Sequence, residues 1–88
     1  MDPRNNTRAE LQILEAIVQA IDRRAELFTA IEATQTHDEA IAAAAKLLGV
    51  GEIQARAVLD MQARRWTQGE LRKITDHIAV LRAELESD

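Results

Sequence analysis

Hydrophobic side chains recur at spacings of three and four residues along the first part of the chain, a pattern typical of a helix face that packs against a neighbour. Two such rows run side by side, so the apolar face is broad. The first row consists of Leu11, Leu14, Val18, Ile21, Ala25 and Phe28, and the second of Ile13, Ile17, Ala20, Leu27 and Ile31. The pattern predicts a long helix with one apolar side.

The start of this helix is marked by a capping box, TRAE at Thr7–Glu10, in which the threonine oxygen accepts a backbone N–H and the glutamate reaches back. No glycine or proline interrupts residues 8–33. We therefore predict one helix over about 7–33. Residues 1–6, which carry Pro3 and two asparagines, are expected to form a disordered lead-in.

Two further capping boxes divide the rest of the chain. THDE at Thr36–Glu39 predicts a short helix over about 37–48, and Gly49 directly after it suits the left-handed conformation in which many helices end. TQGE at Thr67–Glu70 predicts a last helix over about 68–86. The apolar residues of this last helix repeat the three-four spacing: Leu71, Ile74, Ile78, Leu81 and Leu85.

The segment over about 51–65 predicts another helix, with two neighbouring apolar faces. One row holds Ile53, Ala57, Met61 and Arg64, and the other holds Ala55, Leu59, Gln62 and Trp66. One neighbour cannot cover both faces of a short helix, so we expect part of it to contact a second copy of the chain. Trp66 either fills space within its own chain or anchors this contact. The expected dimer contacts are Ile53, Ala55, Val58, Leu59, Met61, Gln62 and Trp66.

These elements place the chain in the all-α class, as a single helical domain over 1–88. The helices over 7–33 and 68–86 each carry an apolar row and are separated by a compact insert, so we expect them to pack antiparallel as a coiled-coil hairpin. The helices over 37–48 and 51–65 are expected to form a tip of two short helices. A plain four-helix bundle is the alternative architecture.

Composition limits the partners and the location. A chain of 88 residues buries only a little over ~60% of its unfolded surface, which favours association. Its net charge of −4 argues against a free-standing nucleic-acid binder. The chain has no cysteine, no signal-peptide pattern and no apolar run near the roughly 18 residues of a membrane span. We therefore expect a cytoplasmic protein without disulfides or membrane contact.

We expect no catalytic residue, metal ion or cofactor. The two histidines, His37 and His77, have no metal-ligating residue four positions away, and no Ser-His, Cys-His or glycine-rich phosphate pattern is present. Positive charge is concentrated at Arg64 and Arg65, near Arg56, Arg72 and Lys73. Because the whole chain is acidic, we interpret these side chains as solvated or as partners in ion pairs between subunits.

The run EIQARAVLDMQARR, from Glu52 to Arg65, resembles a segment of the DNA gyrase and topoisomerase IV A subunits that reads close to EIQAxAILDMQLRRL. LQILEAI, from Leu11, resembles the family's LHILEGL, and the likeness extends from about Thr7 onward. In that family the segment forms the helical tip of a coiled-coil arm, where two subunits meet at the exit gate. The resemblance implies a bacterial-type gate tip, without the longer arm and without a catalytic residue.

The chain departs from the family pattern at two neighbouring positions. Ala63 stands where the family usually has leucine, and Trp66 stands near where a second leucine follows. One change removes volume and the other adds it, so a repacked tip is expected. DNA cleavage in the family uses a tyrosine, and this chain contains none, so strand cleavage is excluded.

Three functions are compatible with these observations. The leading hypothesis is a non-catalytic homodimerisation module that resembles the gyrase A exit gate and pairs through the helices over 37–48 and 51–65. The first alternative is a regulator that binds the matching tip of an intact gyrase or topoisomerase IV A subunit. The second alternative is a nucleic-acid accessory protein that uses Arg64 and Arg65.

Overall fold

The computed structural model describes residues 3–87. Within this range the chain forms five α-helices and one 3-10 helix and no strand, which confirms the expected all-α class. The elements in chain order are α1 (Pro3–Asp22), α2 (Arg24–Glu32), α3 (His37–Leu48), α4 (Glu52–Leu59), η1 (Ala63–Trp66) and α5 (Gln68–Glu86).

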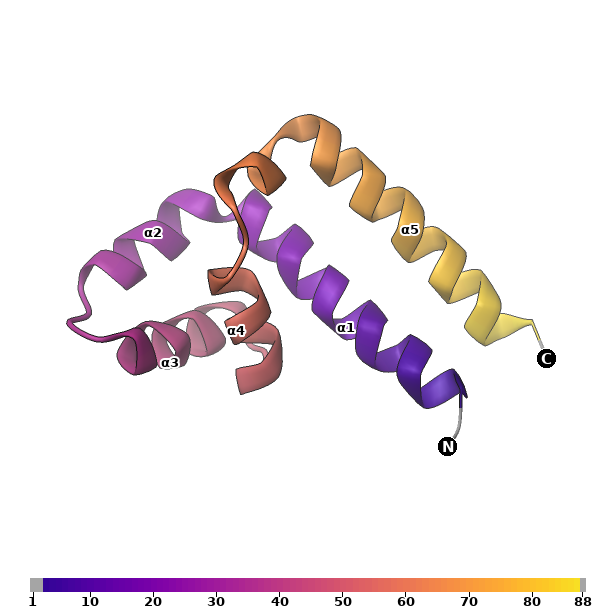
Figure 1. Cartoon of the computed structure of the whole chain (residues 1–88), viewed down its shortest axis with the longest axis horizontal. Coiled ribbons are helices and arrows are strands. Elements are labelled where there is room, and N and C mark those ends of the chain that lie inside the picture. Colours follow the sequence, from indigo (N-terminus) through magenta and orange to yellow (C-terminus); the bar gives the residue numbers. More distant parts are fainter. Residues whose placement is uncertain (1–2, 88) are drawn as a thin grey trace.

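The two longest helices, α1 and α5, lie side by side and run in opposite directions (Figure 1). Arg4 Nη2 donates a hydrogen bond to the carbonyl of Leu85 at 2.9 Å, so the start of α1 is tied to the end of α5. Farther along the pair, Arg82 forms an ion pair with Glu15 at 2.6 Å. The buried side chains of α5 come from its expected apolar row: Ile74, Ile78 and Leu81.

The first helix begins earlier than its capping box predicted. Helix α1 starts at Pro3, so the expected disorder is wrong for residues 3–6, while residues 1–2 lie outside the described range. Proline fits the first helical turn because its missing N–H would have no partner there. Thr7 is thus inside the helix, and its hydroxyl donates to the carbonyl of Pro3 at 3.1 Å.

The expected continuous helix over 7–33 is wrong at Arg23, which separates α1 from α2 with φ −113° and ψ 31°. The Arg23 guanidinium donates to the carbonyl of Leu47, near the end of α3, at 3.0 Å. Its second partner is Glu26, at 2.7 Å, and this hydrogen bond lowers the pKa of the Glu26 carboxyl. The bend directs α2 onto α3, where Leu27 is fully buried. Tertiary packing therefore outweighs the local preference for one straight helix.

Helix α3 follows its sequence signals. The Thr36 hydroxyl accepts a hydrogen bond from the backbone N–H of Glu39 at 3.1 Å, as the capping box predicted. The helix ends at Gly49, whose φ of 67° lies in the left-handed region. Both ends of α3 are thus set by local chemistry.

Helix α4 is shorter than expected. It ends at Leu59, not at residue 65, and the chain continues through a turn into η1. The Arg65 N–H donates to the carbonyl of Gln62 at 2.9 Å, which closes η1 in place of another α-helical turn. The chain must reverse here because α5 packs along α1, and Thr67 then caps α5 by accepting from the Glu70 N–H at 3.2 Å.

The core lies where α1 meets the other helices, and its buried side chains are all hydrophobic within residues 3–87. The two rows predicted on the first helix contribute unequally. The second row supplies Ile17, Ala20 and Leu27, each at most 5% exposed, whereas Phe28 in the first row is 43% exposed. Alanines such as Ala16, Ala20, Ala44 and Ala55 are almost completely buried, which lets the helices approach closely.

Candidate interaction surface

Helix α4 turns one side to the core and the other to solvent. Ala55 and Val58, two of the expected dimer contacts, are 0% and 1% exposed and pack within their own chain. Ile53 is 70% exposed, and Ala57 follows it by one helical turn on the outward side. Met61, just beyond the helix, is half-buried. We call Ile53, Ala57 and Met61 the outward stripe.

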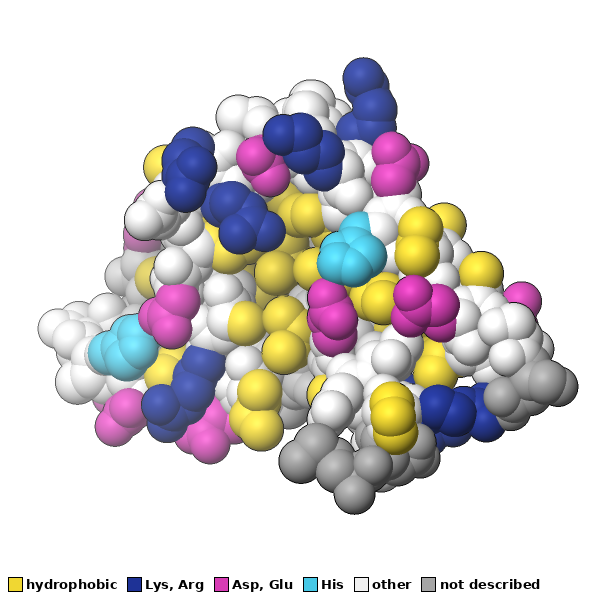
Figure 2. Space-filling model, turned by 45° about the vertical axis from the view of Figure 1, so that its right-hand side comes forward, with side chains coloured by type: hydrophobic (Ala, Val, Ile, Leu, Met, Phe, Trp, Pro, Cys, Tyr) yellow, Lys and Arg dark blue, Asp and Glu magenta, His cyan; other side chains and the backbone are white. Residues whose placement is uncertain are grey.

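A shallow groove runs along the α1 side of this stripe, with a volume of about 420 Å³. Its lining residues are Ile17, Ala57, Asp60, Met61, Gln62, Arg64 and Arg65. Figure 2 shows hydrophobic side chains exposed in a band through the middle of one face, with Lys and Arg side chains gathered near its upper end. The face therefore combines an apolar centre with a charged margin.

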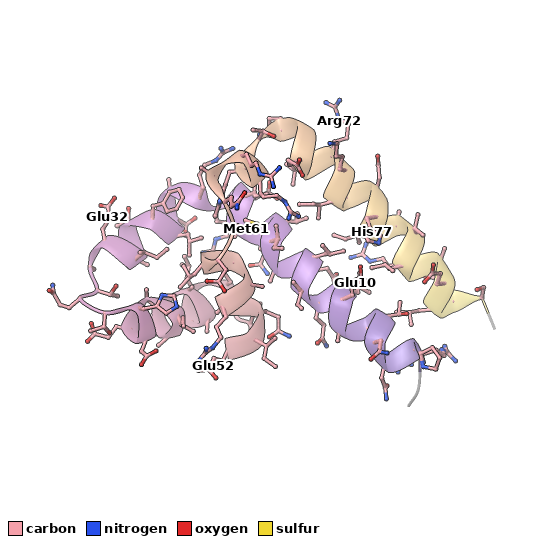
Figure 3. All side chains as sticks on the ribbon, viewed as in Figure 1. Glu10, Glu32, Glu52, Met61, Arg72 and His77 are labelled. Atoms are coloured by element: carbon pink, nitrogen blue, oxygen red, sulfur yellow. The ribbon has the colours of Figure 1, made fainter. Side chains whose placement is uncertain are left out.

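A second groove lies on the other side of Met61 and has a volume of about 530 Å³. We call it the Trp66 groove. Its lining residues are Arg24, Leu27, Phe28, Ile31, His37, Ala40, Val58, Leu59, Met61, Ala63 and Trp66. Met61 lines both grooves and lies near the centre of the molecule in Figure 3. Two more expected dimer contacts, Leu59 and Trp66, thus lie in this second groove.

Trp66 packs against Phe28 of its own chain. The ring centroids are 5.2 Å apart, within the usual range for interacting aromatic pairs, and the planes are inclined by 43°. Trp66 is still only half-buried, so one face of the pair remains open to the groove. Sequence reasoning singled out Trp66 but neither its pairing with Phe28 nor the groove, although these are the only two aromatic residues in the chain.

The positive charges near η1 are partly neutralised within the chain. Arg56 pairs with Glu52 at 3.2 Å, and Arg65 and Lys73 lie 3.6 and 3.8 Å from Glu70. Arg64 instead donates to the side-chain oxygen of Gln62, another expected dimer contact, at 2.8 Å. Both Arg64 and Gln62 are exposed. Arg64 is therefore the member of the Arg64–Arg65 pair that is available to an outside carboxylate or phosphate.

The histidines have separate environments. His77 of α5 lies 3.5 Å from Glu10 of α1, and Figure 3 shows the two side chains facing each other across the helix pair. His37 lines the Trp66 groove at the start of α3. Residues 3–87 contain no group of three or more His, Cys, Asp or Glu side chains placed to hold a metal ion. In the same range, no helix is long and apolar enough to cross a membrane.

Several known proteins contain a segment similar to this chain, although no family model matches it. The chain is 44% identical over 80 residues to the DNA gyrase A subunit of Mycolicibacterium smegmatis and 42% identical over 80 residues to that of Mycobacterium tuberculosis (strain H37Rv). Each match covers 91% of this chain but only 9% of the relative. The chloroplastic/mitochondrial DNA gyrase A subunit of Arabidopsis thaliana is 34% identical over 73 residues, which is 83% of this chain and 8% of the relative.

These matches confirm the predicted resemblance to the gyrase A subunit, both in EIQARAVLDMQARR and over most of the rest of the chain. The matches also show that the resemblance concerns only a small part of each relative, because the chain spans about a tenth or less of the length of the relatives it matches. The activity of a whole gyrase protein does not transfer to so small a part. Over 91% of its length, this chain is similar to a small segment of the DNA gyrase A subunit.

Proposed function

We propose that this protein is a non-catalytic homodimerisation module, related to the gyrase A family and acting in the cytoplasm. In this proposal α1 and α5 form a coiled-coil hairpin that carries α3 and α4 as its tip. Two copies pair through the outward stripe, together with Gln62, and with Leu59 and Trp66 at the margin. The observation that supports the proposal most is the exposure of Ile53, which at 70% exceeds that of the other exposed large hydrophobic residues described, Phe28 and Val80.

Burying the exposed stripe supplies the driving force. Moving one isoleucine side chain out of water contributes about 1.5–3 kcal/mol, and a two-fold axis uses the same patch twice. Asp60 and Arg64 line the same groove beside the stripe. Two-fold pairing can place Asp60 of one copy near Arg64 of the other, which favours the antiparallel arrangement of two identical surfaces.

The mass of the particle in solution tests the proposal. Light scattering after size exclusion, at tens of micromolar, is expected to give the mass of a dimer for the wild type. Ile53→Glu places a charge in the stripe and is expected to give a monomer that keeps its helical circular dichroism. Val80→Glu is the matched control, because Val80 is also an exposed hydrophobic residue, at 54%, but lies on α5. A monomeric wild type, or an equal effect of both variants, would contradict the proposal.

A second candidate is a regulator that pairs with the matching segment of a gyrase or topoisomerase IV A subunit. It is supported by the 44% identity over 80 residues, because a surface that pairs with itself can also pair with a close relative of itself. Mixing the tagged protein with the purified gyrase A protein tests this. Co-elution that Ile53→Glu abolishes would favour the regulator, and exclusive self-pairing would leave it without support.

A third candidate, a nucleic-acid accessory protein, relies on Arg64 and Arg65. The exposed Arg64 is the observation in its favour, and the net charge of −4 weighs against it. Binding to a short DNA duplex at low salt, lost when both arginines are changed to glutamate, is the result that this candidate requires.

A further inference from the structure

We propose that the Trp66 groove is a binding site for a small organic carboxylate with an apolar body. The carboxylate would pair with Arg24, and the body would lie along the Phe28–Trp66 ring pair. The groove shares Leu59, Met61 and Trp66 with the proposed dimer surface, whereas Arg24 and Phe28, on which this inference rests, lie outside that surface.

The groove has the composition of a ligand site. Apart from Arg24 and His37, every side chain that lines it is hydrophobic, and no carboxylate is among them. The floor includes Leu27 and Val58, which are fully buried and therefore held in place by the core. Small-molecule sites in proteins are typically apolar concavities with a few placed polar groups.

Arg24 sets the charge preference. Four other arginines within residues 3–87 already pair with carboxylates: Arg23, Arg56, Arg65 and Arg82. Within residues 3–87, the Arg24 side chain has no hydrogen-bond or ion-pair partner. Its guanidinium is permanently charged and matches a carboxylate with two parallel hydrogen bonds. The groove thus places a cation, unpaired among the described residues, beside an apolar surface.

The dimensions favour a small molecule over a peptide helix. The volume of about 530 Å³ lies within the usual range for small ligands, roughly 300–1,000 Å³. A peptide helix about 10 Å wide would fill this volume with little more than one turn, too little to dock stably. His37 begins α3 and Arg24 begins the neighbouring α2, so the two lie toward opposite ends of the groove. His37 can donate to a polar group at the far end of the ligand.

Octanoate and 1-octanol are suitable probes because they share an apolar chain and differ in charge. Titration of the full-length chain, followed by 15N NMR and by the fluorescence of Trp66, is expected to show saturable binding of octanoate. The affinity for octanoate should exceed that for octanol at least threefold. Arg24→Gln should reduce octanoate binding to the level of octanol. Arg72→Gln, the matched control on an exposed arginine outside the groove, should leave it unchanged.

A second variant separates shape from charge. Ala63→Leu fills part of the groove and should lower the affinity for both probes at least threefold. The amide spectrum of the free variant shows whether its fold is retained. Equal affinity of wild type and Arg24→Gln for octanoate would overturn the proposal. Chemical-shift changes confined to residues outside the groove would also overturn it. The same holds if the groove binds an acidic helical peptide but neither octanoate nor octanol.

Discussion

At the scale of single residues, Leu27 and Phe28 show how neighbouring positions acquire opposite roles. Leu27 is fully buried under the bend, whereas Phe28 is 43% exposed and supports Trp66 at 5.2 Å. Both residues belong to apolar rows predicted for one and the same helix. Which of them faces the core depends on the direction that α2 takes after Arg23.

Truncating these two side chains should therefore have unequal effects. Leu27→Ala is expected to lower the free energy of unfolding by about 2–5 kcal/mol, since it removes the packing contacts of a fully buried side chain. Phe28→Ala, the adjacent control, should lower the free energy of unfolding by a smaller amount. It should also shift the fluorescence emission of Trp66 to longer wavelength by exposing its ring. Urea denaturation followed by circular dichroism measures both. Equal losses would mean that α2 does not pack as described.

The interface residues predicted from the sequence separate in the same way. Ile53 and Gln62 are exposed and Met61 is half-buried, as a contact surface requires. Ala55 and Val58 belong to the core. Spacing placed all of them on apolar faces, but it could not say which face meets the chain itself and which meets solvent.

At the scale of elements, the capping boxes were reliable at two of three places. Thr36 and Thr67 cap α3 and α5 through hydrogen bonds of 3.1 and 3.2 Å. Thr7 has the same local sequence pattern but lies inside α1, because Pro3 begins the helix a turn earlier. A capping box starts a helix only when the preceding residues do not themselves extend it.

This difference gives a direct comparison between two threonines. Thr36→Ala should lower the free energy of unfolding by about 1 kcal/mol, the usual cost of losing a side-chain cap. Thr7→Ala should change it by no more than about 0.5 kcal/mol, because no cap is lost. Thermal and urea unfolding of both variants against wild type provide the measurement. A larger loss at Thr7 would show that the first helix begins at its capping box in solution.

At the scale of the whole molecule, the shape follows from one antiparallel pair and one compact tip. Figure 1 shows α1 and α5 side by side, with α2, α3 and α4 gathered at the end away from the termini. The outward stripe and the Trp66 groove both belong to this gathered end. Contacts with a partner and with a ligand would thus be concentrated there, while the helix pair supports them.

Dimerisation through the stripe should also couple stability to concentration. For a protein that folds and pairs together, the melting temperature rises with total protein concentration by mass action. We expect this rise for the wild type and for Val80→Glu over a hundredfold concentration range. Ile53→Glu should melt at a temperature independent of concentration. A flat profile for the wild type would contradict pairing even if a dimer were seen at one concentration.

The sequence by itself determined the helical class, both ends of α3, the start of α5 and the similarity to gyrase A, because caps, breakers and apolar spacing act within a few residues. Only the tertiary structure decided the bend at Arg23, the early end of α4 and the opening of the Trp66 groove. These features arise from contacts between residues far apart in the chain, such as Arg23 with Leu47 and Phe28 with Trp66. Local sequence patterns indicate the secondary structure that each segment favours, and packing between segments decides where a helix bends or ends.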